Sequence, residues 1–183
     1  TAAEAEKLSA ALAELPEKVA EILENVEEYQ HLASFNQNIH DIFFIGRGQD
    51  YALCCEGSLK LKEISYMHSE AYAAGELKHG TISLIDVGVP VVAVATEDAL
   101  LEKTINNIKE VKARGAFVIF VCKKGMARND DFYDQLIEIP ETQELFMPIL
   151  TVIPLQTYAY YTSIYKGCDV DKPRNLAKSV TVE

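Results

Sequence analysis

The sequence predicts an α/β fold, a three-layer α/β/α sandwich around a mainly parallel sheet that is preceded by N-terminal helices. From residue 41 onward, short apolar runs alternate with amphipathic helical stretches, which indicates strands separated by crossover helices. The apolar runs contain almost no alternating polar residues, a pattern typical of strands buried on both faces. Helices that connect such strands cover the two faces of the sheet through right-handed crossovers.

The first 34 residues form a distinct acidic segment. They contain eight Glu and two Lys, and therefore carry −6 of the net charge of −11. Apolar residues recur at helical spacing on both sides of Pro16, which we expect to begin a second helix. We interpret residues 1–38 as a helical lead-in whose apolar stripe packs on a neighbouring surface and whose glutamates face solvent.

The remaining elements follow in chain order. A strand at 42–45 ends in Gly46-Arg47-Gly48 and leads into a helix at about 51–66. The next expected elements are a strand at 90–95, a helix at 101–111 ended by Gly115, strands at 117–121 and 136–139, and a helix at 147–165 bounded by Gly167. The chain is 49% hydrophobic, which is ample for the core of such a domain.

The composition argues against several classes of protein. No apolar run approaches the roughly 18–20 residues that a membrane span needs, and the N-terminus lacks the pattern of a signal peptide. A net charge of −11 argues against nucleic-acid binding, which requires a basic surface. We therefore expect a cytoplasmic domain that binds neither nucleic acid nor membrane.

The cysteines and histidines give no indication of a metal site. No C-x-x-C pair is present and the four His are scattered, so we expect no metal. Cys54, Cys55, Cys122 and Cys168 are interpreted as free buried thiols of a reducing compartment, in preference to a disulfide scaffold.

A glycine turn follows the first strand. Open parallel sheets bind ligands at the carboxyl ends of their strands, and glycine lets backbone amides approach an anion at a helix N-terminus. Gly46 and Gly48 begin the dinucleotide pattern, but Tyr51 stands where its third glycine would be. The motif therefore supports no nicotinamide cofactor, and both a tight strand-to-helix turn and a ligand-binding loop remain open.

Charged residues repeat along one face of the helix at 51–66. Glu56, Lys60 and Glu63 are spaced by four and three residues and so share a helical face, whereas Lys62 points elsewhere. Spacing alone leaves two interpretations. The row is either surface ion pairing or a carboxylate–ammonium–carboxylate arrangement at a cleft, suited to proton transfer.

Two non-periodic segments add further candidates. The stretch Glu70–Gly80 is dense in ionisable groups, and its His79 is either a structural hydrogen-bonding residue or an acid/base group that titrates near neutrality. The tail Asp169–Glu183 lacks amphipathic periodicity, as disordered tails do. Its Lys178 is either a solvated charge or, if the tail folds into a cleft, an imine-forming nucleophile.

Two long stretches carry a family resemblance. SLKLKEISYMHSEAYAAGELKHG (Ser58–Gly80) and DVDKPRNLAKSVTVE (Asp169–Glu183) closely resemble the glutamine–fructose-6-phosphate aminotransferase family, and the match extends from about residue 41 to 183. Members of that family have a glutaminase domain and two sugar isomerase (SIS) domains. The resemblance implies that residues 39–167 form the second SIS domain and that residues 168–183 form an active-site tail.

The resemblance also assigns roles on the helix at 51–66. It places the family's catalytic glutamate on Glu63, which shuttles a proton between C1 and C2 of the opened sugar. It places on Lys60 the lysine that assists proton movement at the sugar hydroxyls, and on Glu56 a residue that contacts the sugar. These assignments favour the proton-transfer interpretation of the charged row.

The other implied roles fall outside that helix. The resemblance makes His79 the residue for ring opening, acting in the family dimer at the neighbouring subunit's active site. It makes Lys178 the lysine that forms an imine with the open-chain ketose, and it places a sugar contact on Ala177. An imine is an electron sink that acidifies the adjacent carbon, so a poised carboxylate can move the proton.

The resemblance implies partners and leaves alternatives. It implies fructose 6-phosphate and glucosamine 6-phosphate as ligands, and a homodimer. It also implies a glutaminase domain and a first SIS domain elsewhere in the same polypeptide, because this sequence has Thr1 in place of the glutaminase cysteine and has no Ser/Thr-rich phosphate loop. Thr81 stands where the family usually has proline. Two alternatives remain: a regulatory SIS module that binds a sugar phosphate, and a deglycase of phosphorylated fructosamines. Neither of them needs the tail lysine.

Overall fold

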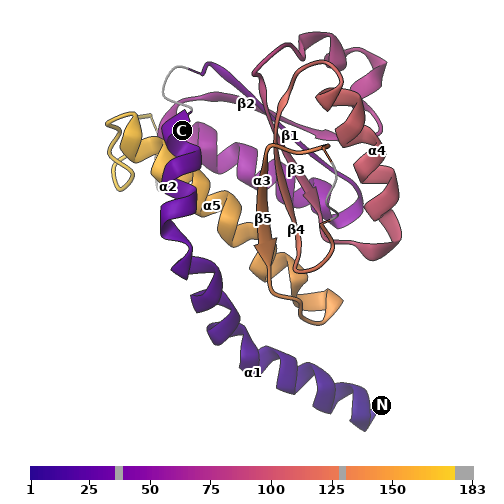
Figure 1. Cartoon of the computed structure of the whole chain (residues 1–183). Coiled ribbons are helices and arrows are strands. Elements are labelled where there is room, and N and C mark those ends of the chain that lie inside the picture. Colours follow the sequence, from indigo (N-terminus) through magenta and orange to yellow (C-terminus); the bar gives the residue numbers. More distant parts are fainter. Residues whose placement is uncertain (36–38, 128–130, 176–183) are drawn as a thin grey trace, which may run out of the picture.

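A computed structural model describes residues 1–35, 39–127 and 131–175, and within them five strands form one parallel sheet in the order β2-β1-β3-β4-β5. Figure 1 shows the sheet with helices on both faces. The strands are β1 (Asp41–Gly46), β2 (His68–Ala73), β3 (Pro90–Ala95), β4 (Phe117–Lys123) and β5 (Gln135–Ile139). The predicted α/β/α sandwich is confirmed.

The helices divide between the two faces of the sheet. They are α1 (Ala2–Glu24), α2 (Val26–Phe35), α3 (Gly48–Ser65), α4 (Leu101–Lys112) and α5 (Met147–Tyr165). On one face α3 packs against α5, which also contacts α2 and α1, whereas α4 covers the other face (Figure 1). None of the helices described here is long and apolar enough to cross a membrane.

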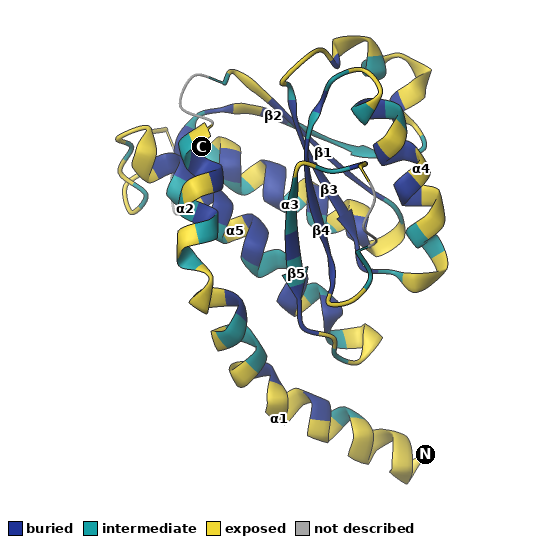
Figure 2. Cartoon of the chain, in the orientation of Figure 1, coloured by how far each residue is buried: buried dark blue, intermediate teal, exposed yellow. Residues whose placement is uncertain are grey.

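Each central strand contributes side chains to two separate apolar cores. On β1, Ile42 and Phe44 belong to the cluster beneath α3 and α5, whereas Phe43 and Ile45 belong to the cluster beneath α4. Successive side chains of a strand point to opposite faces, so a strand covered on both sides must be apolar throughout. Figure 2 accordingly shows the central strands as buried along almost their whole length.

Strand β2 is absent from the predicted elements. It occupies the edge of the sheet beside β1, with Asp41 in register with His68 and Gly46 with Ala73. Its sequence, HSEAYA, has polar residues at His68 and Glu70 on one face, and only Ser69 is fully buried. An edge strand needs little apolar character because one of its sides is open to water, and it therefore lacks the pattern that reveals the inner strands.

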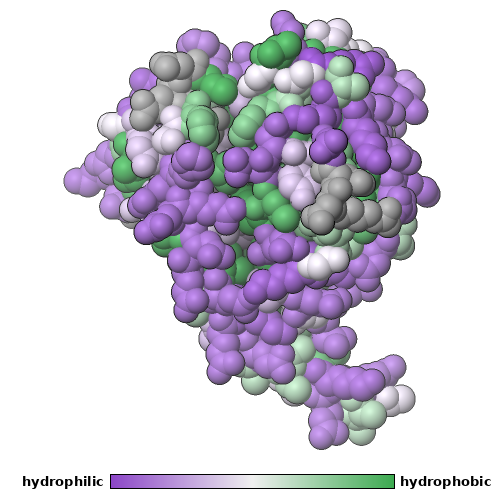
Figure 3. Space-filling view, viewed as in Figure 1, coloured by the Kyte–Doolittle hydropathy of each residue, from purple (hydrophilic) through white to green (hydrophobic). Residues whose placement is uncertain are grey.

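The prediction that Pro16 begins a second helix is wrong. Helix α1 continues through Pro16, and the break comes at Asn25. An interior proline leaves the carbonyl four residues earlier without its helical partner. That carbonyl belongs to Leu12, a residue that is 54% exposed, so water can reach this side of the helix. In the view of Figure 3, largely hydrophilic residues cover the projecting α1.

The expectation of four buried thiols is only partly correct. All four cysteines are free, and Cys54 and Cys122 are buried, but Cys55 is exposed and Cys168 is half-buried. Cys54 and Cys55 are adjacent on α3, where successive side chains point about 100° apart, so only one of them can face the core. Burial raises the pKa of the Cys122 thiol to about 12.

A buried carboxylate connects the turn after β1 to the segment after β3. Asp50, which is 2% exposed, accepts hydrogen bonds from the backbone N–H of Thr96 at 2.7 Å, from its hydroxyl at 2.5 Å, and from the N–H of Glu97 at 3.3 Å. Burial raises the pKa of Asp50, while the hydrogen bonds from Thr96 and Glu97 oppose that rise. Asp50 therefore determines how the first turn of α3 sits on the neighbouring strand.

Replacement of Asp50 tests this connection. Asp50→Ala should lower the free energy of unfolding by roughly 2–4 kcal/mol, because it leaves buried N–H groups without an acceptor. Asp50→Asn retains one carbonyl oxygen and should lose less than half of that stability. Urea unfolding followed by circular dichroism measures both variants, and equal losses for alanine and asparagine would contradict the role of the acceptor oxygen.

Candidate active site

The carboxyl ends of the five parallel strands lie at the same end of the sheet, and the chain order reverses between β1 and β3. Open α/β sheets bind ligands at such reversals. Here Gly48 has φ 54° at the start of α3, and the backbone N–H of Gln49 donates to the Glu97 carboxylate at 2.5 Å. A Cβ on Gly48 would collide with that carboxylate. The protein's own anion thus occupies this helix N-terminus, and the geometry favours the tight-turn interpretation of the glycine motif.

Glu56, Lys60 and Glu63 form a continuous charged row on α3, as their spacing predicts. Lys60 Nζ lies 2.7 Å from Glu63 Oε2 and 3.7 Å from Glu56 Oε1. The three side chains are 26–37% exposed, so the row is partly desolvated but open to a ligand. The hydrogen bond to Glu63 is the main cause that raises the pKa of Lys60, and the charge of Glu56 adds to it, so the two carboxylates stabilise the ammonium form.

Lys62 points away from this row and has a structural position. Its Nζ donates to Ser58 Oγ at 2.7 Å and to the backbone carbonyl of Ser69 at 2.8 Å. Ser58 and Ser69 are also joined through their hydroxyls at 3.0 Å. These bonds connect α3 to the edge strand β2. Lys62 therefore has a structural role, whereas Lys60, two residues earlier, belongs to the charged row.

His79 belongs to the segment that follows β2 and not to the helix that carries the charged row. It ends the short 3₁₀ helix η1 (Leu77–His79), and its side chain is exposed. No hydrogen bond or ion pair among residues 1–35, 39–127 and 131–175 connects it to Lys60 or Glu63.

The start of the C-terminal tail returns to the end of α3. The backbone N–H of Arg174 donates to the Tyr66 hydroxyl at 2.8 Å, and the Arg174 guanidinium lies 4.1 Å from the centre of the Tyr66 ring. Tyr66 follows α3 directly and lies three residues after Glu63. Ala177 and Lys178 lie outside the described residues, but the chain leading to them is held beside the helix that carries the charged row.

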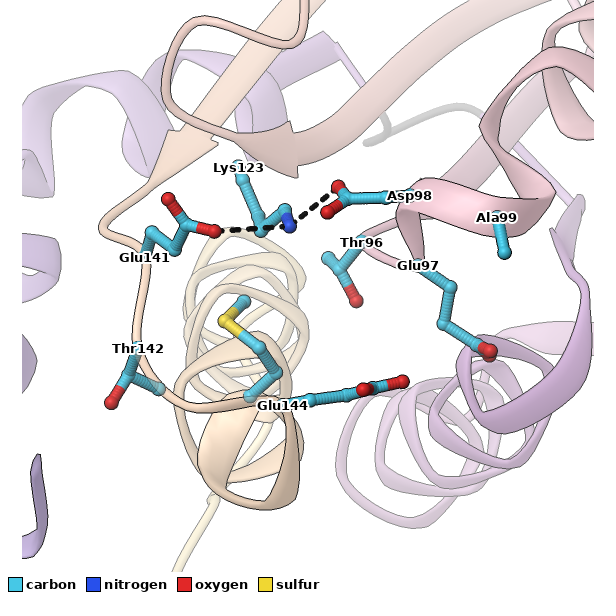
Figure 4. A pocket seen from close by; sticks show the side chains of 9 residues that line it. Thr96, Glu97, Asp98, Ala99, Lys123, Glu141, Thr142 and Glu144 are labelled. Atoms are coloured by element: carbon cyan, nitrogen blue, oxygen red, sulfur yellow. Dashed lines mark hydrogen bonds and ion pairs between the residues drawn. The ribbon is translucent and has the colours of Figure 1, made fainter. Parts of the chain in front are cut away.

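A cavity at the strand ends lies outside the expectations from sequence. It has a volume of about 230 Å³, and its lining combines the segments that follow β3 and β5 with the last residue of β4 (Figure 4). The lining residues are Thr96, Glu97, Asp98, Ala99, Lys123, Glu141, Thr142, Glu144 and Met147. The signal for it in the sequence was the presence of charged residues directly after apolar strands, a position where ligand sites are common.

Lys123 is the buried charge of this cavity. Its side chain is 9% exposed and lies 2.6 Å from Asp98 and 3.3 Å from Glu141. Burial lowers the pKa of Lys123, but the hydrogen bonds to these two carboxylates outweigh burial and raise it. The lining holds further carboxylates on Glu97 and Glu144 and no cation besides Lys123, so its charge disfavours a phosphate group. None of Glu56, Lys60, Glu63 and His79 lines it.

Comparison with known proteins places this geometry in a family. The SIS domain family matches residues 35–166. The chain is 58% identical over 172 residues to the isomerizing glutamine–fructose-6-phosphate aminotransferase of Caldanaerobacter subterraneus subsp. tengcongensis, and 55% identical over 180 residues to that of Clostridium tetani. These matches cover 94% and 98% of this chain, but the chain spans only 28% and 30% of those relatives.

A solved structure supports the same placement. The C-terminal domain of glucosamine-fructose-6-phosphate aminotransferase from Francisella tularensis superposes with a TM-score of 0.88 and 37% identity, covering 94% of this chain and 48% of that one. The tagatose-6-phosphate ketose/aldose isomerase of Escherichia coli has a TM-score of 0.70 at 18% identity, which is a likeness of fold alone. The parallel five-stranded sheet and the match over residues 35–166 together show that the chain belongs to the SIS domain family.

Proposed function

We propose that this chain is the isomerase domain of an enzyme that makes glucosamine 6-phosphate from fructose 6-phosphate and glutamine. The relatives at 55–58% identity carry that enzyme name. The observation that carries the proposal is the Glu56–Lys60–Glu63 row on α3, with the start of the C-terminal tail held against Tyr66 at the end of the same helix. A tail lysine and a helix carboxylate can then act on one sugar.

In this proposal Lys178 and Glu63 share the chemistry at C1 and C2. The amine of Lys178 condenses with the C2 ketone of the open-chain sugar and releases water. The resulting imine draws electrons from C1, whose proton becomes acidic. Ammonia released from glutamine adds to C2 and displaces the Lys178 amine, which frees the lysine and leaves C2 as the imine of ammonia. Glu63 takes the C1 proton of this imine and returns a proton at C2, which gives the 2-amino aldose. Ala177 and Glu56 contact the sugar beside these groups.

Lys60 supports this transfer by its charge. It lies between two carboxylates, which raise its pKa and stabilise its ammonium form. An ammonium at 2.7 Å from Glu63 orients that carboxylate and offers its remaining N–H groups to sugar hydroxyls as charge develops on them. The partial exposure of the row leaves these donors within reach of a ligand.

His79 acts in ring opening at the active site of a second subunit. Its exposure, and the absence of bonds to the charged row within the described chain, support a role at a neighbouring molecule. The enzyme is therefore a homodimer in this proposal. The carboxylate-rich lining of the cavity at the strand ends disfavours phosphate there, and in this proposal the sugar phosphate binds to a first SIS domain of the same polypeptide.

The domain boundaries complete the proposal. Residues 1–38 are a helical lead-in, residues 39–167 are the SIS domain and residues 168–183 are the active-site tail. A glutaminase domain and a first SIS domain belong to the same polypeptide. The four free cysteines support a reducing compartment, the cytoplasm.

Glu63→Gln in the full-length enzyme tests the proton shuttle. The amide cannot accept the proton, so kcat for glucosamine 6-phosphate formation should fall by roughly 10²–10⁴-fold, with glutamine hydrolysis retained. Glu27→Gln on the exposed side of α2 is the matched control and should leave kcat unchanged. Product formation within twofold of wild type in Glu63→Gln would refute the assignment.

Borohydride trapping tests the imine. Reduction of the full-length enzyme in the presence of fructose 6-phosphate should fix the sugar phosphate covalently on Lys178, as seen by peptide mass spectrometry. Lys178→Ala should abolish both the adduct and isomerisation while glutamine hydrolysis continues. A regulatory SIS module would bind the sugar without an adduct, and a deglycase would release sugar from a phosphorylated fructosamine, so either result would replace the proposal.

The 183-residue chain by itself should make no detectable glucosamine 6-phosphate from fructose 6-phosphate and glutamine. It spans under a third of its relatives, and in the proposal both ammonia release and phosphate binding belong to other domains. A coupled assay for glucosamine 6-phosphate measures this with the full-length enzyme as positive control. Glutamine-dependent product from the chain alone would show that its active site is complete.

A further inference from the structure

The chain that leaves α5 closes into a short loop at the end of α3. The Cys168 thiol lies 4.0 Å from the carbonyl oxygen of Ser65. Six residues later, the backbone N–H of Arg174 donates to the hydroxyl of Tyr66 at 2.8 Å. The two ends of the loop therefore meet at two consecutive residues of the chain. We call residues 168–174 the tail loop.

The tail loop starts from a buried junction between α3 and α5. Ser65 and Ser163 are fully buried. The Ser163 hydroxyl donates to the carbonyl of Ile64 at 2.7 Å, and the backbone N–H of Cys168 donates to the carbonyl of Ser163 at 3.0 Å. These bonds connect the last turn of α5 to the last turn of α3, so the point from which the loop leaves the fold is fixed.

Asp169 gives the tail loop an internal turn. Its Oδ1 accepts hydrogen bonds from the backbone N–H groups of Asp171 at 3.0 Å and of Lys172 at 3.2 Å. An aspartate that bonds to the backbone two residues later forms an Asx turn. Pro173 follows with its backbone φ fixed by the ring. The loop is therefore bent locally and is delivered to Tyr66 in a defined direction.

Tyr66 holds Arg174 at two points. Its hydroxyl accepts the backbone N–H of Arg174, and its ring lies 4.1 Å from the Arg174 guanidinium. A guanidinium within about 6 Å of a ring centre is attracted to the face of the ring. Because one contact fixes the backbone and the other fixes the side chain, the direction in which the chain leaves Arg174 is set as well.

The backbone of Tyr66 is unusual for a bulky residue. It has φ 58° and ψ 20°, and its N–H donates to the carbonyl of Lys62 at 3.2 Å to end α3. Helices commonly end in this left-handed conformation, but glycine or asparagine usually supplies it, because a side chain makes it costly. Glycine would end α3 at least as well. The aromatic side chain at this position therefore has a use other than helix termination, and its described contacts with Arg174 identify that use.

The closure of the loop shortens the tether of the tail lysine. Lys178 lies ten residues after Cys168 but only four residues after Arg174. A chain of four residues spans at most about 14 Å, whereas a chain of ten residues spans about 36 Å. The effective concentration of a tethered group falls roughly as the −3/2 power of tether length, so the shorter tether gives an advantage of about fourfold. Tyr66 lies three residues after Glu63, so this tether begins beside the charged row.

We propose that Tyr66 and Arg174 are positioning residues that anchor the C-terminal tail for imine formation by Lys178. The inference rests on the proposed function of Lys178 and adds to it the means by which the amine is kept near Glu63. Neither positioning residue needs to contact the sugar. The anchor changes no bond-making step; it raises the local concentration of the amine and restricts its direction of approach.

The test measures the rate of imine trapping in the full-length enzyme. Borohydride reduction with a subsaturating concentration of fructose 6-phosphate gives the adduct on Lys178, which peptide mass spectrometry quantifies over time. Tyr66→Gly removes both contacts and suits the left-handed backbone, so it should slow adduct formation by about fourfold or more and keep the fold, as checked by circular dichroism. A fall of less than about twofold would overturn the inference.

A double variant tests whether the two residues act through each other. Arg174→Ala loses the guanidinium but keeps the backbone N–H, so it should slow trapping less than Tyr66→Gly does. In the Tyr66→Gly background, Arg174→Ala should have no further effect, because residues that act through one contact are not additive. Additive losses would show that Arg174 acts on the sugar directly, and the inference would be wrong.

Conservative and control variants separate anchoring from general damage. Arg174→Lys keeps a cation over the ring and should trap faster than Arg174→Ala, and Tyr66→Phe keeps the ring and should trap faster than Tyr66→Gly. The matched controls Arg114→Ala at the exposed end of α4 and Tyr160→Phe on the exposed side of α5 should trap as fast as wild type. If Tyr66→Gly does not fold, wild-type rates in both Tyr66→Phe and Arg174→Ala would overturn the inference, and slower trapping in both would support it.

The wild-type enzyme distinguishes this inference from the proposed function. If wild type gives no adduct on Lys178, the imine role itself fails and the inference falls with it. If wild type gives the adduct and the Tyr66 and Arg174 variants form it equally fast, the proposed function stands and only the anchor is refuted.

Discussion

The buried carboxylate of Asp50 is the constraint on which the placement of the active helix depends. It joins the turn that leaves β1 to the segment that leaves β3, across the point where the chain order of the sheet reverses. The orientation of α3 follows from that connection, and α3 carries Glu56, Lys60 and Glu63. A carboxylate removed from water is costly unless its hydrogen-bonding capacity is used, and here both oxygens accept.

The same charge pattern occurs twice in the chain, with different exposure. Lys60 and Lys123 each lie between two carboxylates, but Lys60 is 32% exposed and Lys123 is 9% exposed. A buried cation requires its partners in order to remain charged, so Lys123 is committed to Asp98 and Glu141. Lys60 lies where a ligand can reach it. Glu56 and Glu63 therefore orient its ammonium group and still leave it free to bind a ligand.

The alternation of strand and helix could be predicted from the sequence because each inner element carries its own pattern. The strand at 90–95 and the helix at 147–165 agree with β3 and α5 at both ends. Strand β2 could not be predicted, because its sequence HSEAYA shows neither an apolar run nor strict alternation, unlike that of β5 at the opposite edge of the sheet. The prediction at Pro16 was wrong because proline favours the first turn of a helix, but here it lies inside the exposed helix α1, which continues through it. The spacing of Glu56, Lys60 and Glu63 correctly predicted their shared face.

The sequence by itself determined the fold class, the charged row and the family resemblance, because these depend on patterns within a single element or on long matching segments. Only the tertiary structure decided which distant groups meet. Asp50 and Thr96 are 46 residues apart, and Lys18 reaches the carbonyl of Glu141 over 123 residues. Such contacts depend on strand order and on the register between elements, and no local pattern records these.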